Sequence, residues 1–319
     1  MSNDWRSLLP PEILKSPVGQ WRVRGRVRRE ESGGRWRVVQ ATGSQDFSRH
    51  RDYEAGDELR RLDWRVMARS DRNVVRLHES EGRQTIIFGL DASASMKFTG
   101  DHGISVREKA VHKGEYGRFL VVGATWQLLA TGERVGFESE VRAGAGARWI
   151  ERICAPLLEF EWSASDEING GTTAWGLKVL TGAPIGSRVV LTGDFLDPMD
   201  GVEEWISVVR HRRLQLGLVR VRAQEEETFW TKNDGAAGKK GAWKSGKELL
   251  FRCLEVVGRE VPASPKAVAT TYLEARKTRE RELQRLAQRT GGWYLPVTTS
   301  QPLAEVLPEV VRRCQSGRS

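Results

Sequence analysis

The residues best suited to chemistry in this sequence stand where a short apolar run ends. Residues 86–90 read IIFGL, and Asp91, Ser93 and Ser95 follow at alternate positions. Such a run is typical of a buried strand, so one carboxylate and two hydroxyls would stand on the residues that leave it. These side chains suit three roles: a catalytic nucleophile, a cation site, or the polar end of a strand whose side chains only satisfy backbone groups.

The enzyme interpretations are weakly supported. Neither serine stands in the G-x-S-x-G sequence of a hydrolase elbow, and none of the 5 histidines is obviously paired with them. Asp91 could form an aspartyl phosphate, but phosphotransferases of the haloacid-dehalogenase type carry a second aspartate where this chain has Ser93. A hard cation fits better, because Mg²⁺ takes oxygen ligands and needs only one or two carboxylates. On these residues alone, a cation site and a capped strand end are equally supported.

Two further stretches add another hydroxyl and another acid. Residues 170–173 read GGTT, a loop loosened by glycine before a predicted helix, and residues 191–194 read LTGD, a strand that ends in an aspartate. In a parallel sheet the carboxyl ends of the strands share one edge, and ligands collect at that edge. We therefore expect Thr172 and Asp194 at the same edge as Asp91.

The elements that must position these side chains alternate along the chain. Apolar runs predict buried strands, and apolar residues at helical spacing predict helices between them. We expect strands at residues 85–91, 133–139, 187–195, 214–221 and 293–297, and helices at 115–132, 147–160, 173–180, 202–212, 269–292 and 301–313. This alternation predicts a Rossmann-type α/β fold, with a doubly wound, mainly parallel sheet and helices on both faces.

Three motifs in this order resemble the metal-ion-dependent adhesion site of von Willebrand factor type A domains: D-x-S-x-S, G-G-T, and an aspartate at a strand end. The resemblance covers roughly residues 85–222, and the three parts occur in the family's order. It implies that a divalent cation is surrounded, directly or through water, by Asp91, Ser93, Ser95 and Thr172, with Asp194 nearby. Mg²⁺ is the expected ion, with Mn²⁺ or Ca²⁺ as alternatives. The resemblance also implies that an acidic residue of a partner protein fills the open position of the metal, so that the site binds and does not catalyse.

A second dense motif lies upstream, in residues 51–69. Its interleaved arginines and acids around two aromatic residues suit an ion-pair network laid over aromatic faces, although charge runs are more often solvated helices. The pattern R-x-Y-x-x-G-D-x-x-R-x-x-D-W, followed by an A-R pair and then by D-x-S-x-S-M, is similar to the hallmark of bacterial domain-of-unknown-function family 58 (DUF58). The matching residues of the upstream motif are Arg51, Tyr53, Gly56, Asp57, Arg60, Asp63, Trp64, Ala68 and Arg69.

The DUF58 resemblance implies a partner and a role. Members of that family resemble proteins that work with MoxR-type AAA+ ATPases in maturing enzymes or assembling complexes. The implied function is an adaptor, not an enzyme, whose metal grips an acidic residue of the ATPase or of its client. For residues 51–69 we expect a structural role, clamping the N-terminal extension onto the main domain.

The hydropathy pattern divides the chain into an extension and a main domain. Residues 1–82 hold few long apolar segments and predict an N-terminal extension rich in irregular and β structure. Residues 83–319 predict the von Willebrand factor A-like domain, with a polar insertion rich in lysine and glycine at about 223–262. The three cysteines lie too far apart for a zinc site, and their odd number argues against a disulfide framework.

The formal net charge of +9 raises an alternative function. Residues 21–29 read WRVRGRVRR, which could neutralise phosphates in a nucleic-acid-binding protein. No nucleic-acid motif accompanies this run and its alternation suits a solvated hairpin, so nucleic acid is the less favoured partner. A third and weaker alternative is a metal-assisted phosphohydrolase that uses Asp91 and Asp194.

The first residues do not resemble a signal peptide and no apolar run is long enough to span a bilayer, so we expect a cytoplasmic protein.

Overall fold

The computed structural model of the protein describes residues 5–10, 47–52, 74–78, 84–99, 105–106, 109–138, 140–146, 148–162, 171–196, 201–224, 226, 249–252 and 260–316. The chain divides into two compact units, one made of Met1–Arg24 with Gln84–Ser319 and the other of Gly25–Arg83. In the second unit, β1 (Phe47–Asp52) pairs in antiparallel fashion with β2 (Val74–His78). The domain boundary that we place between residues 82 and 83 stays a prediction.

Several predicted features fall outside the described residues. They include the arginine-rich run at 21–29 and most of the polar insertion, of which β10 (Leu249–Arg252) and β11 (Glu260–Ala263) form a described antiparallel pair. Arg51 of the upstream motif lies in β1. The other motif residues that we single out lie outside the described part of the chain: Tyr53, Gly56, Asp57, Arg60, Asp63, Trp64, Ala68 and Arg69.

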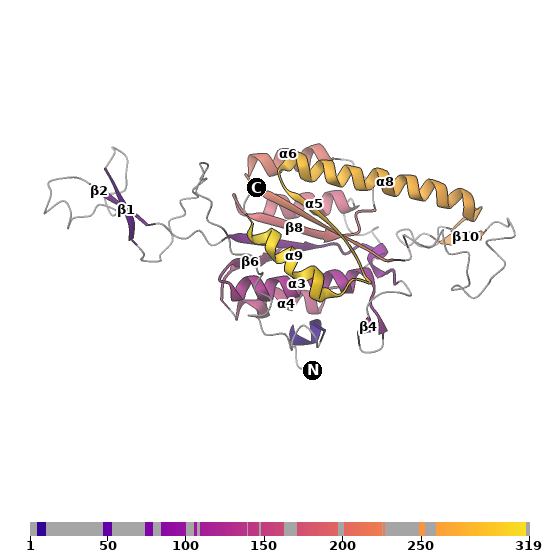
Figure 1. Ribbon diagram of the computed structural model, residues 1–319, viewed down its shortest axis with the longest axis horizontal. Coiled ribbons are helices and arrows are strands. Elements are labelled where there is room, and N and C mark those ends of the chain that lie inside the picture. The colour runs from indigo at the N-terminus through magenta and orange to yellow at the C-terminus, as the bar shows by residue number, and fades with distance from the viewer. Residues whose placement is uncertain are drawn as a thin grey trace. The chain divides into compact units, whose positions relative to one another are not determined.

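A six-stranded sheet forms the centre of the first unit (Figure 1). The order across the sheet is β12, β9, β8, β3, β6, β7. Their bounds are β3 (Thr85–Leu90), β6 (Arg134–Phe137), β7 (Val141–Gly144), β8 (Arg188–Gly193), β9 (Gln215–Arg222) and β12 (Trp293–Thr298). Five strands are mutually parallel, and β7 joins the β6 edge in antiparallel fashion. The predicted α/β fold with a mainly parallel sheet is therefore confirmed.

The chain enters this sheet at its middle and winds outward in both directions. From β3 it crosses to β6 on one side, and it later returns to the other side of β3 with β8 and then β9. The boundary between β3 and β8 is therefore the topological switch point, where open α/β sheets leave a crevice for ligands. The residues that follow β3 and β8 are those expected to hold the site.

Helices cover both faces of the sheet (Figure 1). One face packs against α3 (Lys113–Ala130), α4 (Trp149–Leu158) and α9 (Leu303–Gln315). The other packs against α5 (Gly171–Gly182), α6 (Val202–His211) and α8 (Pro265–Thr290). The short 3-10 helix η1 (Trp5–Leu8) leads into Leu9, and both Leu8 and Leu9 are buried in the α3 and α4 core. Each strand end therefore opens between two layers of helices.

The structure differs from the predicted elements in three places that bear on the site. Strand β7 was not predicted, because its four residues are short and only partly buried. Helix α3 begins at Lys113, two residues before the predicted start, because the His112 side chain caps it by accepting a hydrogen bond from the Glu115 N–H. Helix α5 begins at Gly171, so Thr172 lies in its first turn and not in the loop before it.

Packing between α5 and α6 depends on a glycine. The Trp205 ring is fully buried, and a methyl group placed on Gly176 would overlap it. The Trp205 indole N–H also donates to the Thr173 carbonyl at 2.9 Å, which fixes the start of α5. The position of the α5 first turn is therefore set by this contact.

We predict that Gly176→Ala lowers the free energy of unfolding by about 1–3 kcal/mol, the usual cost of overpacking, although alanine is the better helix former. In a Trp205→Leu background the same change should cost much less, because the ring that it strikes is gone. Urea unfolding of the four proteins measures this coupling. Equal costs in both backgrounds would show that the two residues do not constrain each other.

Candidate metal site

Asp91 and Asp194 leave neighbouring strands at the switch point. Strands β3 and β8 are paired through Leu90 and Thr192, and the Asp91 N–H donates to the Thr192 carbonyl at 2.9 Å. A Cβ atom on Gly193 would lie only 2.8 Å from the Asp91 Oδ2 atom. Glycine at this position therefore lets the Asp91 carboxylate lie directly against the next strand.

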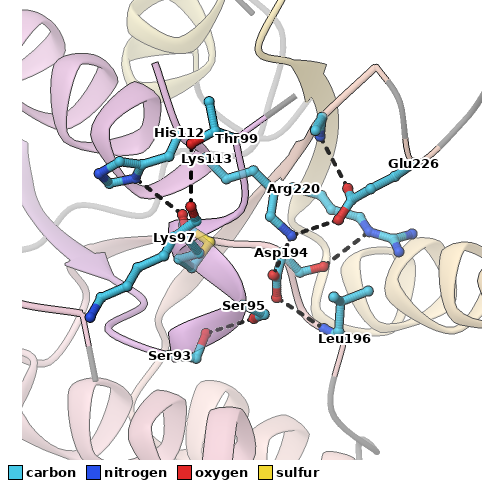
Figure 2. A network of polar contacts seen from close by, with 12 residues as sticks. Ser93, Ser95, Lys97, Thr99, His112, Lys113, Asp194, Leu196, Arg220 and Glu226 are labelled. Carbon is cyan, nitrogen blue, oxygen red and sulfur yellow. Dashed lines mark hydrogen bonds and ion pairs between the residues drawn. The ribbon is translucent and has the colours of Figure 1, made fainter. Parts of the chain in front are cut away.

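The loop after β3 folds back on the Asp91 carboxylate. Oδ1 of Asp91 accepts a hydrogen bond of 2.9 Å from the Ser93 N–H, and the chain then forms the short 3-10 helix η3 (Ala94–Lys97). Met96 anchors this turn because its side chain is fully buried in the core. The turn brings the two serine hydroxyl oxygens to 3.1 Å from each other, with Ser93 9% and Ser95 6% exposed (Figure 2).

The separation of the two hydroxyl oxygens fits adjacent ligands of one small cation. Ligands at about 2.0–2.1 Å and at right angles, as Mg²⁺ requires, lie roughly 2.8–3.0 Å from each other. The two hydroxyl oxygens, at 3.1 Å, are slightly farther apart than this, so a small movement of the loop would bring them to the required separation. In the described part of the chain, no three His, Cys, Asp or Glu side chains form a metal-binding group. A cation here would therefore be bound by hydroxyl oxygens and a carboxylate. Hard cations such as Mg²⁺ take such ligands, whereas Zn²⁺ sites are built from cysteine, histidine and carboxylate side chains.

Thr172 is buried, 3% exposed, in the first turn of α5. Helix α5 packs on β8, whose end carries Asp194, so Thr172 stands on an element that borders the switch point. The five predicted site residues, Asp91, Ser93, Ser95, Thr172 and Asp194, are thus all buried on the elements that flank β3 and β8.

Asp194 has a partner that the sequence did not indicate. Its Oδ2 atom lies 2.7 Å from the Lys113 ammonium, and its Oδ1 atom accepts a hydrogen bond of 3.2 Å from the Leu196 N–H (Figure 2). Phe195, between them, has a positive φ of 51°, which is uncommon for a bulky residue and turns the chain back toward the carboxylate. Arg220 Nε also donates to the Asp194 carbonyl at 3.1 Å. The Asp194 side chain is therefore committed to an ion pair.

Lys113 joins two acids. Its side chain is 0% exposed, and its ammonium lies 2.7 Å from both Asp194 Oδ2 and Glu226 Oε1. Glu226 is held in turn, since its Oε2 atom accepts from the Ala223 N–H at 3.0 Å. Burial alone would lower the pKa of Lys113, but the two carboxylates outweigh it and hold that pKa above its ordinary value. Lys113 therefore stays protonated and neutralises part of the acidic edge.

Glu138 is a further residue that the sequence analysis missed. It follows β6 with a φ of 47°, and its Oε1 atom accepts hydrogen bonds from the Leu90 N–H at 3.2 Å and from the Trp175 indole at 3.1 Å. It therefore ties the end of β3 to α5. Burial raises the pKa of the Glu138 carboxyl, while the two hydrogen bonds oppose that shift.

Comparison with known proteins identifies a family. The family described as "Protein of unknown function DUF58" matches residues 49–231, more than half of the chain. The chain therefore belongs to the DUF58 family. The search of curated proteins gives no match.

Solved structures with a similar chain trace include two from Bacteroides. The conserved hypothetical protein BatB from Bacteroides thetaiotaomicron is 12% identical, with a TM-score of 0.37 over 73% of this chain and 100% of that one. An aerotolerance-related membrane protein from Bacteroides fragilis, solved with multiple mutations to serines, is 14% identical, with a TM-score of 0.35 over 72% of this chain and 99% of that one. Among the helices of this protein that the structure describes, none has the length and apolar character to cross a bilayer.

We predict that Glu138→Gln and Glu138→Ala differ. Glutamine keeps an acceptor for the Leu90 N–H and the Trp175 indole N–H. Alanine leaves both donors without an acceptor and should lower the free energy of unfolding by about 1–3 kcal/mol. The pKa of Glu138 is higher in the folded than in the unfolded protein, so folding favours its protonated form and its contribution to stability falls as pH rises through that pKa. The stability of Glu138→Gln relative to the wild type should therefore rise as the pH rises from the ordinary glutamate pKa of 4.5 through the raised pKa of Glu138.

Urea unfolding across that pH range measures both effects. Glutamine and alanine variants that are equally unstable at every pH would show that acceptance of the two hydrogen bonds does not hold β3 to α5.

Proposed function

We propose that this DUF58 protein is a metal-dependent protein-interaction module that works as an adaptor and not as an enzyme. The proposal is carried by the buried pair of serine hydroxyls in the turn whose Ser93 N–H binds the Asp91 carboxylate, at the switch point of the sheet. Burying the oxygen-bearing side chains of three residues on one short turn costs free energy unless a partner binds them. The spacing of the two serine hydroxyls suits adjacent ligands of a hard cation.

The residues that would hold the ion are those of the β3 turn with Thr172. Asp91 would bring the negative charge, and Ser93, Ser95 and Thr172 neutral oxygens. Mg²⁺ is the preferred ion, with Mn²⁺ or Ca²⁺ as substitutes, because all three take oxygen ligands. When bound, the ion would supply an open position for an acidic side chain of a partner protein.

Two contacts favour binding over hydrolysis. Asp194, the base that a phosphohydrolase would need, is occupied by Lys113 at 2.7 Å. The His112 Nδ1 atom accepts the α3 cap from the Glu115 N–H, so this ring nitrogen is not available as a base for a serine. Both contacts support a site that holds a ligand without turning it over.

For the partner we propose a MoxR-type AAA+ ATPase or its client, in the cytoplasm. This part of the proposal follows from the likeness of the two sequence motifs to those of proteins that work with such ATPases. Nucleic acid is the less favoured partner, since the arginine-rich run that suggested it has no accompanying motif.

Metal binding can be measured without a partner. We predict that the purified protein binds Mn²⁺ and Mg²⁺ in isothermal titration calorimetry and that Asp91→Ala abolishes the binding heat, because the charged ligand is gone. Glu204→Ala, which removes an exposed carboxylate from the first turn of α6, is the matched control and should bind as the wild type does. Binding that survives Asp91→Ala would place the ion elsewhere.

Partner capture is a separate prediction. A MoxR-type ATPase or a client protein should co-purify with the tagged chain in Mg²⁺, and it should be lost both in chelator and in Asp91→Ala. Glu204→Ala again serves as the control. A partner held equally well in chelator would contradict the metal-dependent mode of binding.

A further inference from the structure

Lys113 is buried against two carboxylates, one of which, Asp194, follows β8 at the switch point. A buried ammonium loses its hydration, and only opposite charges in good geometry compensate for that loss. Asp194 and Glu226 provide these charges from two other elements, each at 2.7 Å from the Lys113 Nζ atom. Because the side chain of Lys113 is 0% exposed, water does not weaken these contacts.

The ion pair divides the two aspartates of the site into different roles. Asp194 has one carboxylate oxygen on Lys113 and the other on the Leu196 N–H. Asp91 turns one oxygen to the Ser93 N–H within the loop that carries the serine hydroxyls. Asp91 therefore contacts the loop that carries the serine hydroxyls, whereas Asp194 forms the ion pair with Lys113.

The charge balance at the site follows from this division. A divalent ion on Asp91 and neutral hydroxyls would carry, together with these ligands, a net charge of about +1, while the buried group of Lys113, Asp194 and Glu226 would carry about −1. With Asp194 in the shell as well, the ion and its ligands would be neutral. An ion whose own shell holds one carboxylate, and not two, attracts an anion to its open position more strongly than it attracts water or a carbonyl group.

We propose that Lys113 sets the ligand preference of the site: by holding Asp194 in an ion pair, it keeps that carboxylate off the cation, so that the bound ion selects a carboxylate from outside. The inference rests on the proposed function and identifies Lys113 as a positioning residue of that site. The class of ligand is an acidic side chain, and Lys113 acts on it through Asp194 without touching it.

The test replaces Lys113 with methionine, which has a similar length and no charge, and measures Mn²⁺ binding by calorimetry. Release of Asp194 should tighten Mn²⁺ binding about tenfold or more, because affinity rises with the number of charged ligands. Acetate, as a stand-in for the partner's carboxylate, should tighten Mn²⁺ binding in the wild type and should do so much less in Lys113→Met. This second readout is a thermodynamic coupling that a merely structural role would not change.

A second variant identifies the source of the gain. Lys113→Met with Asp194→Asn leaves no carboxylate to be released and should lose the gain in affinity. If Lys113→Met alone does not fold, because two buried acids are left without a cation, then Lys113→Met with Glu226→Gln removes one of them and takes its place in the same comparison.

The outcomes separate the inference from the proposed function. Wild-type binding that depends on Asp91, with no gain in Lys113→Met or an equal gain when Asp194 is asparagine, would overturn the inference and leave the function standing. No Mn²⁺ binding by any of these proteins would overturn both. Binding that appears only when Lys113 is removed would support the role of Lys113 and contradict the proposed function of the native chain.

Discussion

Asp91 and Asp194 come together because β3 and β8 are hydrogen-bonded in parallel, although the two residues lie far apart in the sequence. Parallel pairing puts the ends of both strands at one edge, and the change in winding direction opens that edge between two layers of helices. Gly193 completes the arrangement, since any side chain there would meet the Asp91 carboxylate. The serine turn, the first turn of α5 and the buried lysine are all arranged around this one pairing.

The buried charges at this edge are costly, and their positions are correspondingly well determined. A lysine without exposure is tolerated only where acids surround it, and here one acid follows β8 and the other follows β9. Glu138 contributes in another way, because its hydrogen bonds tie β3 to α5 and its burial raises its pKa. Polar groups of this kind stabilise a fold little, but each of them fixes the relative position of two elements.

The sequence revealed those features whose signal is local. The pattern of an apolar strand that ends in an acid can be recognised from about six or seven consecutive residues. The fold class, β3, β8 and the positions of Asp91 and Asp194 could therefore be predicted. Glu138 and Lys113 could not, because their roles depend on contacts across the sheet. One indication of Lys113 was present, since it lies seven residues before Leu120 and so shares the buried face of α3. The start of α5 was misplaced because Gly171 and Thr172 are poor helix formers, and tertiary packing on Trp205 overrides that preference.

The buried lysine also bears on the order in which the protein can mature on the ribosome. Lys113 lies 81 residues before Asp194 and 113 residues before Glu226, so its charge cannot be enclosed until both acids have been synthesised. Until then the first turn of α3 must stay hydrated, because an ammonium without its counterions is too costly to bury. We therefore expect this edge of the sheet to be less tightly packed in a nascent chain that ends before Glu226 than in the finished protein. Completion of β9 and the residues just after it is the step that closes the site.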